Sequence, residues 1–222
     1  MIKTTGSVYG CGNNYFGSLG DGTSVDRSSP TQITALGNEV AQMAGGFGHS
    51  LALKSDGSVM TFGENTYGQL GDGCHYSGSH RCMGNAGHRL NPWEATELGN
   101  DNAYVDGGNR NSMVLKKDGR IFTCGYGWTG ALGRGDSDED KENSSSWIEA
   151  IIDSDNRKAV LSGNSHHILA LKDDGRVEGF GADNMGALAG RGGGEPQQMT
   201  EVGSDNADVA GQYHFSLILK NN

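Results

Sequence analysis

Proline, basic residues and long apolar runs are scarce in this sequence of 222 residues. No apolar run approaches the roughly 20 residues that cross a bilayer, and the N-terminus lacks the basic-then-apolar order of a signal peptide. Lys and Arg number 17 against 27 Asp and Glu, so the formal net charge is −10. Because this charge repels phosphate backbones, we expect no binding to nucleic acid. The missing apolar span and signal peptide predict a soluble protein, in the cytoplasm or in a virion, that does not bind a membrane.

Glycine is abundant instead, at 38 positions, but only 3 prolines and no three-residue period exclude a collagen-like chain. Four ungapped segments resemble one another; they follow Gly6, Gly57, Gly119 and Gly175 and read SVYGCGNNYFGSLG, SVMTFGENTYGQLG, RIFTCGYGWTGALG and RVEGFGADNMGALA. Such self-similarity predicts a repeat architecture. The units cover residues 6–56, 57–118, 119–174 and 175–222, within one domain over 1–222.

Each unit opens with a short alternating stretch, which is typical of a strand with one buried face. Its inward positions are Val8, Val59, Ile121 and Val177, followed by Cys11, Phe62, Cys124 and Phe180. A loop then ends at one repeated place, occupied by Pro30, Pro92, Ser146 and Pro196. A second strand starts at this place, a third and a fourth follow, and the fourth leads through Asp-Gly into the next unit. Asp-Gly between alternating strands indicates a tight hairpin.

That hairpin places the last strand of one unit beside the first strand of the next, so the sheets are offset from the repeats. The chain therefore begins and ends with half a sheet, and an unpaired half exposes an edge. We expect an all-β fold: a β-propeller of four-stranded antiparallel blades with four repeat units. Pairing of residues 6–19 with 209–220 would close the ring through the N- and C-terminal half-blades.

Gly17-Ser-Leu-Gly-Asp-Gly followed by Pro30, and then Ala-Gly-Gly-x-x-His-Ser-Leu-Ala-Leu-Lys-x-Asp-Gly over residues 44–57, resembles the repeats of the regulator of chromosome condensation family. The resemblance extends from Gly6 to Lys220 and implies a propeller. Propellers of that family usually have seven blades, whereas this sequence has four units. A four-bladed ring, an arc completed by a second copy and a piece of a longer array all fit.

The resemblance specifies the fold more closely than the function. Propellers of this kind include a nucleotide exchange factor for a small nuclear GTPase, a plant light receptor and bacterial inhibitors of β-lactamases. Phage particles also carry such repeats, in structural or appendage proteins. Because function varies among proteins that share this scaffold, the function of a relative can be assigned to this chain only by analogy.

An insertion between Gly73 and Asn91 concentrates thiols and imidazoles, at Cys74, His80, Cys82 and His88. Two thiolates and two imidazoles suit tetrahedral zinc, although the close Cys-x2–4-Cys spacing of zinc knuckles is absent. A Cys74–Cys82 disulfide and a plain exposed loop are the alternatives. The acidic run 136–140 lacks the glycine and glutamate of an EF-hand calcium loop, which favours a hydrated loop. We expect no cofactor.

The other reactive side chains follow the repeat. Cys11 and Cys124 take the place of Phe62 and Phe180, so we interpret them as small core residues. Four histidines fall at or beside one repeated place before the last strand: His49, His166, His167 and His214. Recurrence favours a structural role for them, such as bonding the backbone of the neighbouring blade.

Aromatic residues in or beside the loops differ from unit to unit, which is typical of a binding face. The candidates for partner binding are Tyr15, Phe16, Tyr67, Trp93, Trp128 and Trp147. Some of them are expected to cap the core instead. Since neither a phosphate-binding loop nor a catalytic triad can be assigned, the sequence predicts a non-enzymatic module for a protein or glycan partner. A homo-oligomer, a virion or appendage component, and a nucleotide exchange factor for a small GTPase are the further hypotheses.

Overall fold

The computed structural model describes residues 1–74, 87–135, 142–161, 167–212 and 214–221. Within these residues the chain folds into strands joined by loops and single 3-10 turns, as expected for an all-β protein. The strands are β1 (Tyr9–Gly12), β2 (Arg27–Gln32), β3 (Val40–Gly45), β4 (His49–Lys54), β5 (Val59–Gly63), β6 (Arg89–Glu94), β7 (Asn102–Gly107), β8 (Asn111–Lys116), β9 (Ile121–Gly125), β10 (Ser144–Glu149), β11 (Asn156–Leu161), β12 (His167–Lys172), β13 (Val177–Gly181), β14 (Gly193–Gln198), β15 (Asn206–Gln212) and β16 (Phe215–Lys220). The 3-10 helices are η1 (Thr34–Leu36), η3 (Thr96–Leu98), η4 (Asn184–Gly186) and η5 (Thr200–Val202).

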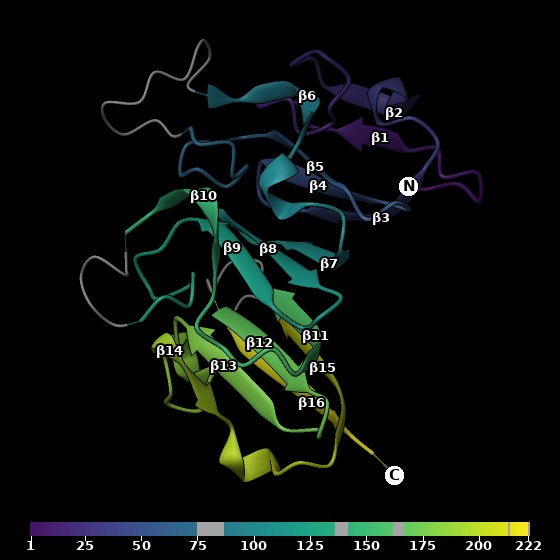
Figure 1. Ribbon diagram of the computed structural model, residues 1–222. Coiled ribbons are helices and arrows are strands. Elements are labelled where there is room, and N and C mark those ends of the chain that lie inside the picture. Colours follow the sequence, from purple (N-terminus) through teal and green to yellow (C-terminus); the bar gives the residue numbers. More distant parts are fainter. Residues whose placement is uncertain (75–86, 136–141, 162–166, 213, 222) are drawn as a thin grey trace.

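The strands form five antiparallel sheets that follow one another along the chain (Figure 1). We name them sheet A (β1–β2), sheet B (β3–β6), sheet C (β7–β10), sheet D (β11–β14) and sheet E (β15–β16). Sheets B, C and D are four-stranded, whereas A and E have two strands each. The Asp-Gly turns join β4 to β5, β8 to β9 and β12 to β13, so the predicted offset between sheets and repeats is confirmed.

The glycine of each Asp-Gly turn is required by both its conformation and its surroundings. Gly57 has φ +88°, and a Cβ at this position would overlap the carbonyl oxygen of Asn100, just before β7 of the next sheet. A buried asparagine at the start of that sheet then holds the turn: Asn102 Nδ2 donates to the Gly57 carbonyl at 2.7 Å. The same bond recurs from Asn156 to Gly119 at 2.8 Å and from Asn206 to Gly175 at 2.7 Å. These contacts fix each hairpin against its successor.

The core lies between successive sheets and consists of four separate apolar clusters. In the cluster between sheets B and C, Leu51 and Leu53 of β4 pack with Val59, and Val105 and Val114 close it from the next sheet. Alternation along the strands sends these side chains to one face. Apolar burial between the sheets is therefore the main force that holds the array together.

One expectation needs correction, and a second is not confirmed. The place held by Pro30, Pro92 and Pro196 belongs in the third unit to Trp147, not to Ser146. The amide of Ala150, three residues after Trp147, donates to Ile121 O at 2.9 Å. In the other units, the amide three residues after each proline makes the equivalent bond to the first strand. Over residues 150–155, all of which the structure describes, the third unit lacks the 3-10 helix found there in the others. Because this connection is one residue shorter than in the other units, the sequence pattern pointed to Ser146 and not to Trp147.

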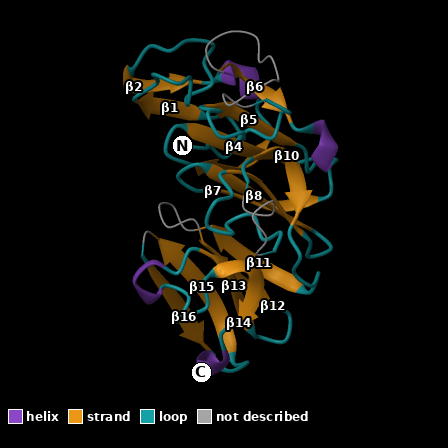
Figure 2. Ribbon diagram, turned by 90° about the vertical axis from the view of Figure 1, so that its left-hand side faces the viewer, coloured by secondary structure: helices purple, strands orange, loops and turns teal. Residues whose placement is uncertain are grey.

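The expectation that is not confirmed is the closure of the ring. Sheets A and E stay two-stranded within the described residues and lie at opposite ends of the array (Figure 2). The described parts of 6–19 and 209–220 are not paired with each other, so the structure contains an open array of sheets without the closing one. Among the residues that the structure describes, no helix has the length and apolar character needed to span a membrane.

Candidate partner-binding face

Two sets of loops share one rim of the array. Because His49 at the start of β4 pairs with Gly63 at the end of β5, the loop before β4 lies beside the loop after β5. The same pairing joins Asn111 to Gly125 in sheet C. The loops that precede the fourth strand and those that follow the first strand of a unit therefore alternate along this edge. Most of the predicted aromatic residues lie on these loops.

Phe16 connects sheet A to sheet B on this rim. Its ring contacts Tyr15 edge-on at 4.9 Å between centroids and His88 at 5.0 Å. Tyr15 is exposed, whereas Phe16 and His88 are half-buried. The rim continues to Gly48, where a Cβ would come within 2.8 Å of the Phe16 ring.

Phe47 stands next to Gly48 and is 75% exposed. Its amide donates to the carbonyl of Gly108 at 3.3 Å, which ties this loop to the loop between β7 and β8. An apolar side chain of this size gains nothing from water, so its exposure on a tethered loop is typical of a contact residue.

Arg110 follows on the same loop between β7 and β8, with its guanidinium over two tyrosine rings. The carbon of the guanidinium lies 4.6 Å from the Tyr67 centroid and 6.0 Å from the Tyr126 centroid. The two rings meet edge-on at 5.5 Å. Trp128, beyond Tyr126, is 67% exposed. We call the set Tyr15, Phe16, Phe47, Tyr67, Arg110, Tyr126 and Trp128 the aromatic rim.

Two of the predicted aromatic residues lie elsewhere. Trp93 is half-buried on β6, where its ring lies 5.1 Å from the guanidinium of Arg89. Trp147 is only 7% exposed and belongs to the cluster between sheets B and C. Cys124 occupies the position that Phe62 and Phe180 have in the other sheets, and its side chain is smaller. The Trp147 indole fills the space that a phenylalanine ring would take there. A buried indole cannot serve as an exposed anchor, so Trp147 is a core residue.

The sequence analysis did not select Phe47 or Arg110. The signal was present in the two variable positions of Ala-Gly-Gly-x-x-His, which read Phe47-Gly48 in one unit and Asn109-Arg110 in the next. Only the pairing of β4 with β5 shows that these positions share a rim with the aromatic loops.

Half-buried ion pairs brace the loops behind the rim. Asp21 accepts from Arg27 Nε at 2.7 Å and from Asn14 Nδ2 at 3.1 Å. Asp72 repeats the arrangement in the second unit with Arg89 and Asn65, at 2.6 and 2.8 Å. Burial alone would raise the pKa of Asp21, but the hydrogen bonds from Thr23 and Arg27 outweigh it and lower that pKa. The loops are thus held by charge-assisted bonds.

Two of the recurring histidines, His49 and His167, join neighbouring sheets, through a serine hydroxyl rather than through the backbone; His166 lies outside the described residues. His49 is buried, and its Nε2 is hydrogen-bonded to Ser112 Oγ of the next sheet at 2.9 Å. The Ser112 hydroxyl also donates to Gln69 O at 2.6 Å. His167 and Ser216 repeat this contact at 3.2 Å between sheets D and E. Burial lowers the pKa of His49 to about 4 and is also the main cause that brings the pKa of His167 to about 4.

Half of the predicted zinc cluster, His80 and Cys82, falls outside the described residues. The acidic run 136–140 also falls outside them. Of the remaining two residues, Cys74 donates its amide to Asp72 Oδ1 at 3.0 Å. His88 Nδ1 accepts the amide of Asn65 at 3.1 Å, and burial lowers the pKa of its imidazole. Zinc therefore stays a prediction.

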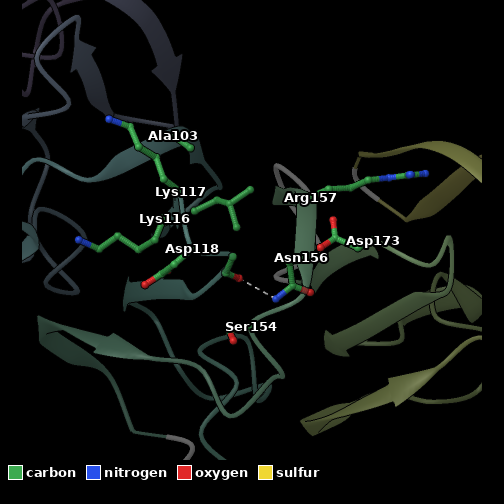
Figure 3. Close-up of a pocket in the computed structure, with 10 residues that line it drawn as sticks. Ala103, Lys116, Lys117, Asp118, Ser154, Asn156, Arg157 and Asp173 are labelled. Atoms are coloured by element: carbon green, nitrogen blue, oxygen red, sulfur yellow. Dashed lines mark hydrogen bonds between the residues drawn. The ribbon is translucent and has the colours of Figure 1, made fainter.

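The opposite rim carries the Asp-Gly hairpins and a polar cavity of about 300 Å³ (Figure 3). Lys116 at its wall is buried and paired with Asp101 at 2.5 Å. Arg157 donates to the carbonyl of Asn206 at 2.6 Å. Figure 3 shows Asn156 reaching across the cavity to the hairpin turn. Lys116 and Arg157 are thus already engaged in contacts within the protein.

Models of the regulator of chromosome condensation (RCC1) repeat match residues 5–53 and 40–69. The chain belongs to the RCC1 repeat family. It is 28% identical over 189 residues to the ultraviolet-B receptor UVR8 of Arabidopsis thaliana, and the match covers 84% of this chain and 40% of the receptor. The RCC1-like propellers of human WBSCR16 (TM-score 0.79, 22% identity) and of Prp20p from Saccharomyces cerevisiae (TM-score 0.78, 17% identity) share its fold.

This RCC1-repeat chain covers about half of those two structures, 54% of WBSCR16 and 53% of Prp20p, while almost all of its own length is matched. Its potential nucleophile in the core is unsuited to catalysis, because burial raises the pKa of the Cys124 thiol well above its usual value. The arrangement on the aromatic rim is suited to recognition.

Proposed function

We propose that this RCC1-repeat chain is a non-enzymatic module that binds a protein partner through the aromatic rim. The observation that carries the proposal is the guanidinium of Arg110 held over Tyr67 and Tyr126, next to the exposed Trp128. Tyrosine, tryptophan and arginine are the side chains that contribute most to protein interfaces. Stacking orders the arginine in advance, so less of its entropy is lost on binding.

The rim also has the extent that a partner needs. It runs over loops of sheets A, B and C, which are connected through Gly48 against Phe16 and through Phe47 bonded to Gly108. Prp20p, which shares the fold, is described as binding Gsp1p and histones. That precedent supports a protein partner for this chain, whose identity is open.

The test compares three immobilised proteins in extracts of cells that contain this protein. The first is the unchanged chain, and the second carries Phe47→Ala, Arg110→Ala and Trp128→Ala. The third is a matched control with Lys117→Ala and Ile151→Ala, two exposed residues away from the rim. Bound proteins are quantified by mass spectrometry.

We expect a partner that the unchanged chain and the control recover equally, and that the rim variant loses by about 10-fold or more. Equal recovery by all three proteins would contradict the proposal. Circular dichroism of each variant separates lost binding from lost folding.

A regulator of a small GTPase is the second candidate, favoured by the shared fold with Prp20p. Nucleotide release from several small GTPases, measured with and without the chain, tests this candidate, which fails if no release is accelerated. The relatives described above are eukaryotic proteins, and none of them supports a virion or appendage component.

A further inference from the structure

One of the four core clusters lacks the two residues that the fourth strand of a unit supplies to the others. These residues are Leu51 and Leu53 between sheets B and C, Met113 and Leu115 between sheets C and D, and Leu169 and Leu171 between sheets D and E. The cluster between sheets A and B contains Val8, Ile33 and Leu36 but, among the described residues, no such pair. In the described part of the chain, no strand equivalent to β4 pairs with β1 of sheet A, so no strand provides this pair of residues.

The missing pair is present at the other end of the chain. Leu217 and Leu219 of β16 hold the places of Leu51 and Leu53, since Lys220 aligns with Lys54. Leu217 and Leu219 are 61% and 62% exposed, whereas Leu51 and Leu53 are 0% and 6% exposed. Exposure of two neighbouring leucines on an unpaired edge strand is unfavourable and invites pairing.

The internal repeats give the register of that pairing. In sheet B, Ser50 pairs with Phe62 and Leu53 pairs with Val59. The equivalent pairs are Ser216 with Cys11 and Leu219 with Val8. Cys11 was expected in the core; it is exposed, because no strand of the described chain covers this part of β1.

Side-chain size at the junction agrees with this register. The Phe62 ring lies against Gly20 of the preceding sheet, where a Cβ would come within 2.8 Å. At the equivalent position after sheet D stands Ala189, with φ +55°, which carries a Cβ. A phenylalanine would clash there, whereas the smaller Cys11 fits.

A hollow of about 410 Å³ with several apolar side chains in its wall marks the same end of the array. It is lined by Met185, Met199, Val202, Phe215 and Ile218, among others, at the junction of sheets D and E. Sheet E therefore has an open edge and an unfilled apolar surface together.

We propose that β16 of one copy of this chain pairs with β1 of a second copy, so that E and A together form a complete four-stranded sheet. The copies join head to tail, and a second identical junction closes a ring of two chains. A second copy is favoured because sheets A and E lie at opposite ends of the array (Figure 1).

A short segment now occupies part of the β1 edge. Ile2 forms a bridge to Val8, and the amide of Tyr9 donates to Met1 O at 2.8 Å. Met1, Ile2 and Lys3 hold the places of Ile218, Leu219 and Lys220, and the segment stops short of the edge at residues 10–12. The longer β16 displaces this segment when the copies join.

The test is a disulfide placed in the expected register. Ser216→Cys, in a background with Cys74→Ser and Cys82→Ser, puts a thiol opposite the native Cys11 of the other copy, and paired strands meet the geometry of a disulfide. Mild oxidation should then give a covalent dimer. Leu217→Cys, whose side chain points to the other face of the strand, and Cys11→Ser with Ser216→Cys should give none.

Native mass spectrometry of the unchanged chain should show a discrete species of twice 23.3 kDa. If the oxidised Ser216→Cys variant were instead a monomer with an internal bond from Cys11 to the new thiol, the proposal would be overturned in favour of a closed four-bladed ring. A monomer without any bond, or an open series of longer assemblies, would overturn it as well.

A second variant tests the apolar contact without touching the register. Leu217→Lys with Leu219→Lys should weaken the dimer by about 100-fold or more while the monomer keeps its fold, because both leucines are exposed there. Val25→Lys, an exposed residue outside the junction, serves as the control. A dimer unchanged by the lysine pair would contradict the proposed contact. This assembly does not depend on the aromatic rim, so either proposal can fail alone.

Discussion

The indole of Trp147 lies against the backbone of Gly71, and a Cβ at Gly71 would overlap its Nε1. The glycine belongs to the loop after β5, and the tryptophan belongs to β10 of the next sheet. Phe62 against Gly20 and Phe180 against Gly133 make the same contact in the other sheets. An aromatic ring over a glycine is thus the repeated joint between sheets.

Gly71→Ala tests this joint. The residue has φ +67°, so alanine is strained there, and its methyl group also clashes with Trp147. We expect a loss of about 3 kcal/mol or more in the free energy of unfolding. Gly37→Ala is the matched control, because Gly37 has φ +70° with no described atom near its Cβ position, and should cost about 1 kcal/mol. Equal losses in urea unfolding would show that the ring contact adds nothing.

Cys124 and Trp147 are expected to act as a pair. Trp147→Ala opens a cavity and should cost about 3–5 kcal/mol, and Cys124→Phe overpacks the same space and should cost about 1–3 kcal/mol. The double variant places a phenylalanine where Phe62 and Phe180 stand in the other sheets. It should lose at least about 1 kcal/mol less than the sum of the single losses. Additive losses would contradict the exchange of one ring for the other.

The sequence predicted the strands, the hairpins and the offset of the sheets, because alternation and Asp-Gly turns are local signals. It placed Trp147 in a loop because the third unit is one residue shorter after Ala150, which only the hydrogen bond to Ile121 reveals. Arg110 was missed for a different reason. Its place in the aromatic rim depends on contacts with Tyr67 and Tyr126, which lie on two other loops. Contacts between distant loops leave no local pattern in the sequence.

His49 should make the stability depend on pH. Its pKa is about 4 in the folded protein because of burial, against 6.5 when unfolded. The lowered pKa means that protons bind preferentially to the unfolded chain, so stability is complete above pH 6.5 and falls as the pH decreases toward 4. Between pH 7 and pH 5 this group should account for a loss of about 2 kcal/mol.

His49→Asn removes that group and copies Asn111, which holds the equivalent place in sheet C. Urea unfolding at pH 7 and pH 5 should show a smaller loss on acidification for the variant than for the unchanged chain. The remaining dependence includes His167, whose pKa is also about 4. An identical loss in both proteins would show that His49 is not buried in its neutral form.

Removal of residues 2–4 should strengthen the proposed dimer. The bridge from Ile2 to Val8 and the bond from Tyr9 to Met1 cover the part of β1 that Ile218 and Leu219 would take. Each such backbone bond contributes roughly 1 kcal/mol net, so freeing the edge should tighten dimerisation by about 10-fold. Sedimentation equilibrium of the shortened and the unchanged chain measures the difference, with circular dichroism to verify the fold. An unchanged or weaker dimer would mean that Met1–Lys3 does not compete with β16 for this edge.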